Sequence, residues 1–357
     1  MTTAGQYPED TQVERDLGQN GPGNAAYRDN SLIGSDAANI PERVGLDLLT
    51  PETASEAAEV EALPAGGEAQ STGGIVRQIA RVFFEHKLAV VSLAFIILVV
   101  LFCWVGPLLY HTNQTTQATA LITPENLPPG SPSHPLGTQE TGFDVLGRLM
   151  YGGQTSLTVG LLSALVATVV GVIWGAVAGY VGRWLDATMM RVVDVVLSMP
   201  VLFLLIALVT VFHSSEPLLI FVIAGVSWLI PARLVRVETL TLRTREYVQA
   251  VKAMGGRSHR IIGRHIIPNA IGTIVVFATF QVATSILLLA ALGYLGFGLP
   301  PPGTDWGSML SQATTSLGNG WWWEVYPVGA AIVLVVIAFN FIGDALRDAL
   351  EVRTQRR

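Results

Sequence analysis

Six long apolar runs limit what this chain can fold into more than any other feature of its sequence. A membrane-spanning helix needs roughly 20 apolar residues to cross about 30 Å of hydrocarbon, and helices that are apolar on every face do not suit a soluble hairpin. Half of all residues are hydrophobic, only 13% are charged, and the mean hydropathy is +0.48. The sequence therefore predicts an all-α polytopic membrane protein with six transmembrane helices. The runs cover residues 88–110, 156–182, 195–212, 217–232, 270–296 and 325–343, and the third and fourth contain Pro200 and Pro231.

The first 74 residues differ from the rest in composition. They contain thirteen acidic and three basic residues, a net charge of −10, whereas residues 75–357 carry +4. This segment is poor in aromatic residues and cannot bury enough apolar surface to offset the entropy cost of ordering. It also lacks the basic start and apolar stretch of a cleaved signal peptide. We expect residues 1–74 to form a disordered acidic cytoplasmic tail and residues 75–357 to form the transmembrane domain.

The basic residues lie mainly on one side of the predicted spans. With the N-terminus inside, the outside connections, about 111–154 and 297–324, contain Arg148, and the other seventeen basic residues after residue 74 lie on the opposite side. Arginine and lysine are retained on the cytoplasmic side. We therefore expect a multi-pass protein of the cell (inner) membrane with both termini in the cytoplasm. Three consecutive tryptophans, residues 321–323, are typical of side chains that anchor at the outer interface.

Three glycines and two polar residues stand out within the predicted spans. Gly171, Gly175 and Gly179 place a small residue at every fourth position of the second span, which lets another helix approach closely. That helix belongs either to the same chain or to a dimer interface or a transport pathway. Gln281 and Asn340 lie in or near the end of the fifth and sixth spans, where polar side chains either bond to neighbouring helices or contact a substrate. All five are candidates for helix packing or for the pathway.

The sequence offers little for chemistry of its own. No span carries a run of charged residues near its middle, which disfavours an ion-coupled carrier or a channel that acts alone. No GxxxxGK[ST] loop occurs, so a nucleotide cannot be held in that way. The six histidines show no metal-ligand spacing, and no nucleophile constellation is present. We expect a non-catalytic chain with no cofactor or metal site, whose energy for uphill transport must come from a partner.

A polar and basic stretch, EYVQAVKAMGGRSHRIIGRHIIPN at residues 246–269, separates the fourth and fifth runs. Thr244 can cap a short helix, Gly255 can end it, and Ser258 can cap a second helix before Pro268. The first helix would carry an apolar stripe made of Tyr247, Val251 and Met254. Such a helix-turn-helix is either a docking surface for a second protein or an amphipathic hairpin on anionic lipid. From the residues alone both interpretations remain open.

This stretch resembles the EAA loop of permease subunits in binding-protein-dependent ABC importers. The family motif is EAA, three residues, Gly, nine residues, then an apolar residue and Pro. Gln249, Ala250 and Val251 stand at the EAA positions and Gly255 at the glycine, and IIPN ends the pattern. Gln249 and Val251 depart from the usual acidic and small residues.

Two further segments resemble the dipeptide, oligopeptide and nickel branch of this family. HPLGTQETGFDVLGRLMYGGQTSL, residues 134–157, is similar to its HxLGTDxxGRDxLxRxxxG segment, and NFIGDALRDAL is similar to its C-terminal end. Gly137, Thr138 and Asp144 match the first motif, whereas Gln139 and Phe143 replace its Asp and Arg. The resemblance runs from about residue 77 to the end of the chain and indicates the second, or C-type, permease chain of that branch.

The resemblance implies the type I ABC importer permease fold and translocation of short peptides, with nickel or another small solute as the alternative. It implies four kinds of partner: a homologous second permease chain, one or two ABC ATPase subunits that bind ATP and Mg, an extracellular substrate-binding protein, and membrane lipid. Nothing indicates a nucleic acid. Residues 237–268 would form a cytoplasmic loop whose short helix enters a groove on an ATPase. The residues implied in this coupling are Glu246, Tyr247, Gln249, Ala250, Val251, Met254, Gly255, Pro268 and Asn269.

Overall fold

The computed structural model describes residues 80–111 and 116–355, and the acidic tail predicted for residues 1–74 lies outside them. The described residues are mostly helical, with two isolated β-bridges and no strand among them. Four helices are long and apolar enough to cross a membrane, and two bent pairs bring the number of candidate spans to six. The four are α3 (Lys87–Leu109), α5 (Val145–Val181), α12 (Ile267–Tyr294) and α14 (Trp322–Gln355).

Two of the predicted spans are each divided between two helices. The helices α6 (Arg183–Leu197) and α7 (Val201–Phe212) meet at 84°, so the third predicted span, 195–212, is not one helix. Pro200 explains the break, because proline lacks an N–H and disfavours a helical residue before it. The helices α8 (Glu216–Ser227) and α9 (Leu229–Leu242) meet at 43°. Here Pro231 cannot donate to the carbonyl of Ser227, and α9 continues well beyond the predicted end at residue 232.

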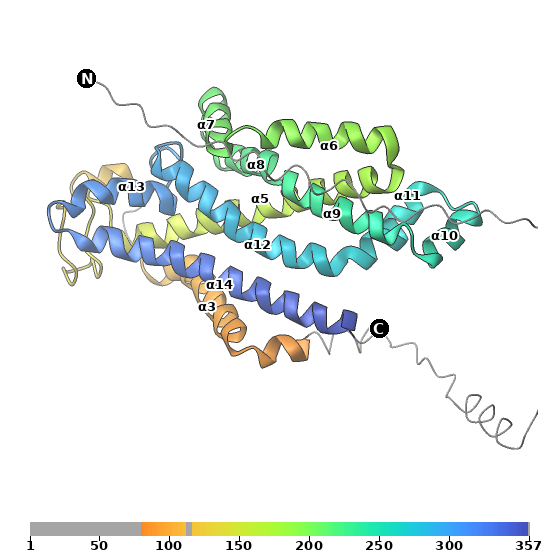
Figure 1. The fold of residues 1–357 in the computed structure, drawn as a ribbon. Coiled ribbons are helices and arrows are strands. Elements are labelled where there is room, and N and C mark those ends of the chain that lie inside the picture. Colours follow the sequence, from red (N-terminus) through yellow and green to blue (C-terminus); the bar gives the residue numbers. More distant parts are fainter. Residues whose placement is uncertain (1–79, 112–115, 356–357) are drawn as a thin grey trace, which may run out of the picture. The chain divides into compact units, whose positions relative to one another are not determined.

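The central helix α5 begins eleven residues before the predicted start of the second span. Asp144 caps it, since its side chain accepts a hydrogen bond of 2.6 Å from the backbone N–H of Gly147. The helix ends at Gly182, which has a φ of +70° that favours glycine. In Figure 1, α5 runs along the bundle with α12 and α14 beside it, and α10 and α13 lie at opposite ends.

A further helix, α13 (Trp306–Leu317), occupies the connection 297–324, where no helix was predicted. Asp305 and Ser308 form a capping box: the Asp305 carboxylate accepts from the Ser308 N–H at 2.9 Å, and the Ser308 hydroxyl accepts from the Asp305 N–H at 3.2 Å. Trp306 anchors the helix, because its indole N–H donates to the Leu149 carbonyl of α5 at 3.0 Å. The spacing of an acid and a serine three residues apart could have revealed this helix.

The main core lies where α3, α5, α12, α13 and α14 meet. Cys103, Leu157, Ile286, Trp306 and Met309 are each at most 1% exposed there. At Gly153 of α5, an added Cβ would lie 2.4 Å from the Cys103 sulfur, so α3 and α5 pack closely. This packing joins α3 to the centre of the domain.

Candidate functional site

The predicted short helix is present as α10 (Glu246–Ala253), at the end of the bundle away from α13. Its end is set by Gly255, whose φ of +81° is strained for other residues. The backbone N–H of Gly255 donates to the Lys252 carbonyl at 3.0 Å, and that of Gly256 donates to the Val251 carbonyl at 3.0 Å. The chain therefore turns sharply at the position where the sequence predicted the end of the helix.

One side chain of α10, Val248, anchors it to the bundle. Val248 is 1% exposed and packs with Ile261 and Ile266, which are also buried, and with half-buried Tyr180 at the end of α5. Burying a valine of this kind contributes about 1.5–3 kcal/mol. The predicted apolar stripe is wrong in part, because only Val251 of its three members lies against this cluster.

The other side chains of α10 face outward. Tyr247 is 41% exposed and Met254 78% exposed, although both were expected in the apolar stripe. They do not pack inward because the helix is oriented by Val248, one position after Tyr247. The exposed set comprises Glu246, Tyr247, Gln249, Ala250, Lys252, Ala253, Met254 and Gly255. We call these eight residues the α10 surface.

The predicted caps of this loop differ in the structure. Thr244 does not cap α10; its hydroxyl donates to the Thr241 carbonyl at 2.8 Å, and Arg245 stands at the N-cap position without a side-chain bond. Gln249 instead donates its side-chain N–H to the Arg243 carbonyl at 2.7 Å. This bond ties the first position of the EAA-like motif back to the segment that enters the helix.

The second helix of the loop is short and changes its winding. Ser258 is the first residue of α11 (Ser258–Ile261) and not its cap, and a π-helical turn, η1 (Ile262–Ile266), leads into α12. Pro268 accounts for the wider turn, since it has no N–H for the carbonyl four residues earlier. Asn269 stands next to it and donates to the His265 carbonyl at 2.5 Å. Both residues are exposed, and both belong to the first turn of α12 and not to α10.

The glycine stripe of α5 packs against α9 of the same chain. A Cβ at Gly171 would lie 2.6 Å from Pro231, one at Gly175 would lie 2.3 Å from the Ala232 carbonyl oxygen, and one at Gly179 would lie 2.8 Å from the Arg236 carbonyl oxygen. The backbones of the two helices are therefore in close contact. Of the two interpretations of the stripe, the structure gives packing within the chain.

Ion pairs that the sequence analysis missed hold α6 against α9. Arg236 binds the Asp186 carboxylate through two hydrogen bonds of 2.5 and 2.6 Å, and Arg233 pairs with Asp194. Arg243, which ends α9, donates to the Gly179 carbonyl at 2.9 Å. The segment that enters α10 is thus attached to α5 and α6. No local spacing rule links these residues, because the partners are 39 to 64 positions apart.

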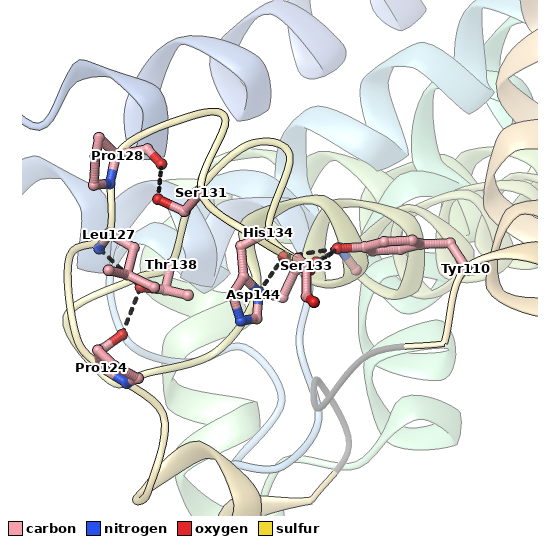
Figure 2. A network of polar contacts seen from close by, with 10 residues as sticks. Tyr110, Pro124, Leu127, Pro128, Ser131, Ser133, His134, Thr138 and Asp144 are labelled. Atoms are coloured by element: carbon pink, nitrogen blue, oxygen red, sulfur yellow. Dashed lines mark hydrogen bonds and ion pairs between the residues drawn. The ribbon is translucent and has the colours of Figure 1, made fainter.

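At the opposite end of the bundle, the motif residues Thr138 and Asp144 fasten the segment that precedes α5 (Figure 2), and Gly137 precedes Thr138 in this segment. The Thr138 hydroxyl donates to the Pro124 carbonyl at 2.8 Å and accepts from the Leu127 N–H at 2.9 Å. Gly137 has a φ of +78°, and a Cβ there would lie 2.1 Å from the Leu127 carbonyl oxygen. In this chain the motif residues therefore stabilise the local structure of the segment before α5.

Asp144 is fully buried, and at this end of the bundle it contacts the start of α5, His134 and Tyr110 (Figure 2). Besides capping α5, its carboxylate lies 3.0 Å from His134 Nδ1 and 3.3 Å from the Tyr110 hydroxyl oxygen. The Tyr110 hydroxyl donates to the Ser133 carbonyl oxygen at 2.6 Å. In the capping box of α13, burial raises the pKa of the Asp305 carboxyl, while hydrogen bonds from Ser308 and Leu299 lower it in part.

The two polar residues predicted inside the fifth and sixth spans lie on neighbouring helices. Gln281 is buried in α12, and Asn340 is half-buried in α14. The helices are in close contact, because a Cβ at Gly343 of α14 would lie 2.9 Å from the Phe280 ring of α12. A substrate contact by either residue remains a prediction.

The described residues form a helical bundle with four candidate spans, or six if each bent pair is one span, with a projecting loop at one end and a fastened cap at the other. Residues 171–356 match the family of binding-protein-dependent transport system inner membrane components, and residues 75–129 match the N-terminal transmembrane domain of oligopeptide transport permease C. The chain belongs to this family of inner-membrane transport components, as the sequence motifs predicted.

Individual relatives are named as permease proteins of peptide transport systems. The dipeptide transport system permease protein DppC of Alkalihalophilus pseudofirmus is 40% identical over 268 residues, which cover 75% of this chain and 86% of the relative. The oligopeptide transport system permease protein OppC of Haemophilus influenzae is 36% identical over 275 residues, 76% of this chain and 86% of the relative. A solved chain of the inward-facing MetNI methionine ABC transporter aligns with a TM-score of 0.48 and 22% identity, over 57% of this chain and 96% of that chain.

Proposed function

We propose that this chain is one of two permease subunits of an ABC importer that carries short peptides across the inner membrane. Similarity to dipeptide and oligopeptide permeases over three quarters of the chain supports the peptide assignment. The proposed partners are a homologous second permease, one or two ATPase subunits that hold ATP and Mg, and an extracellular binding protein. The chain itself is non-catalytic in this scheme and binds no cofactor.

The observation that carries the proposal is the α10 surface. Val248 fixes the helix to the bundle, while Tyr247 and Met254 extend away from it. Large apolar side chains exposed on one short helix are typical of a contact with another protein. The proposal places this surface in the cytoplasm, together with both termini, and in a groove of an ATPase.

The attachments of α9 suggest how movement of α10 would reach the rest of the chain. When the ATPases close, they would displace α10, which is tied through Arg243 to Gly179 of α5. The Arg236–Asp186 pair would carry α6 along with α9. Because α5 runs from this end to the cap at Asp144, a rigid tilt of these packed helices would change access at the outer end.

The proposal is tested by isolating the tagged full-length chain in mild detergent and identifying its stoichiometric partners by mass spectrometry. We expect a second permease and one or two ATPases, and the reconstituted complex with its binding protein should take up labelled short peptides only with ATP. A complex that hydrolyses ATP but imports Ni²⁺ and no peptide would agree with the permease assignment but would overturn the assignment of peptides as the substrate. An active chain without ATPases would overturn both.

A further inference from the structure

A cavity of about 260 Å³ opens at the α13 end of the domain, away from the α10 surface. Its walls come from α4 (Gln117–Ala120), the segment before α5, the first turn of α5, the segment before α13, and α13 itself. Gln117, Thr141 and Gln312 supply polar groups, and Leu121 and Phe143 supply apolar surface. This volume is below the roughly 300–1,000 Å³ of pockets that enclose a drug-sized ligand, so it suits one end of a longer molecule.

A buried arginine, Arg148, stands in the wall of this cavity. Its side chain is 2% exposed, its guanidinium lies 4.5 Å from the centre of the Phe143 ring, and one Nη1 hydrogen donates to the Pro302 carbonyl at 3.1 Å. Its Nε–H has no hydrogen-bond partner. An unpaired N–H of a permanently charged group is costly to bury, and the side chain that carries it lines the cavity.

No carboxylate of the described residues pairs with Arg148 within 4 Å. Asp305 is the acid that interacts with it electrostatically. The oxygens of Asp305 are already occupied by the N–H groups of Ser308 and Leu299, at 2.9 and 3.3 Å. The cavity therefore presents a positive charge and neutral polar groups to whatever enters it.

We propose that this cavity binds a carboxylate, and that the carboxylate is the C-terminal group of a peptide entering the transporter. Guanidinium groups bind carboxylates by charge-assisted hydrogen bonds, and the amides of Gln117 and Gln312 can bond to the peptide backbone beside it. Leu121 and Phe143 then lie against the last side chain. This inference rests on the proposed peptide substrate and assigns Arg148 the selection of its free carboxyl end.

The test compares a peptide acid with the same peptide amidated at its C-terminus, in the complete complex reconstituted into vesicles. The binding protein is loaded to saturation with each peptide, after its affinity for both is measured separately. For the wild type we expect faster uptake of the acid. For Arg148→Gln we expect uptake of the acid to fall about tenfold, as for loss of a charge-assisted bond, with uptake of the amide little changed.

Two further variants keep the test decisive if Arg148→Gln fails to fold. Gln312→Leu changes an exposed side chain of the same wall and should lower the acid-to-amide ratio in the same direction, by a smaller factor. Arg81→Gln removes an arginine that is exposed and, among the described residues, is paired with Glu85 four residues away; it should leave the ratio unchanged.

Equal losses for both peptides, in both cavity variants, would overturn the proposal and leave Arg148 a structural role. Weaker docking of the empty binding protein to the Arg148→Gln complex would also overturn it, since the carboxylate would then come from an acidic side chain of that protein. If the wild-type complex takes up neither peptide, the proposed function fails instead.

Discussion

The close approach of α5 and α9 makes a quantitative prediction for Gly175→Ala. The new Cβ would lie 2.3 Å from the Ala232 carbonyl oxygen and 2.9 Å from the Arg236 nitrogen, and both are backbone atoms that cannot rotate away. The helices must separate, and overpacking of this kind costs about 1–3 kcal/mol. At about 2–4 °C per kcal/mol for a domain of this size, the melting temperature should fall by roughly 2–12 °C.

The chain contains its own probe for this measurement. Cys103 is the only cysteine and is fully buried, so a thiol-reactive fluorophore will label it only as the domain unfolds. Gly225→Ala is the matched control, because nothing lies within 4 Å of its added Cβ in α8. Alanine favours a helix over glycine by about 1 kcal/mol, so the control should melt at the same temperature or higher.

The two variants separate the interpretations of the glycine stripe. If Gly175→Ala has the same melting temperature as the control, the described packing of α5 on α9 is refuted. If Gly175→Ala melts normally but no longer assembles with a second permease, the stripe belongs to an interface between chains.

Two other substitutions test the attachment of the loop. Gly255→Asp should abolish substrate-stimulated ATP hydrolysis in the assembled complex while the domain remains folded by the Cys103 assay; normal stimulation would exclude this turn from coupling. Arg236→Asp should lower the free energy of unfolding by about 1.5–3 kcal/mol, because it removes one partner of a part-buried pair with two charge-assisted hydrogen bonds, and adding Asp186→Arg should restore more than half, as measured by the same thiol assay. A double variant no more stable than the single one would show that the pair contributes little.

Part of this architecture could be predicted from the sequence because the length of an apolar run is a local property of the sequence. The apolar runs located α3, α12 and α14, and the glycine-proline spacing located the turn at Gly255 and the entry into α12. The break at Pro200 shows the limit: composition over 195–212 is apolar throughout, and the bend depends on one missing N–H.

The candidate site was predictable only where a motif was contiguous. The sequence placed Gly255 and Asp144 in motifs, but it did not indicate Val248 as the anchor of α10, because the choice of buried face depends on packing against Tyr180 at the end of α5. The pairing of Arg236 with Asp186 and the cavity beside Arg148 join residues more than 40 positions apart. Arg148 was visible in the sequence as the one basic residue of the outside connections, and that was its only signal.

The central claim is that the α10 surface contacts an ATPase subunit, and a photo-crosslinking amino acid at Ala250 tests it most directly. Ala250 is exposed on α10, and Leu121, 85% exposed near the opposite end, is the control position. In the complex isolated from the membrane, position 250 should give an adduct with the ATPase and position 121 should not. An adduct with lipid alone at position 250, in a complex that retains its ATPases, would contradict the claim.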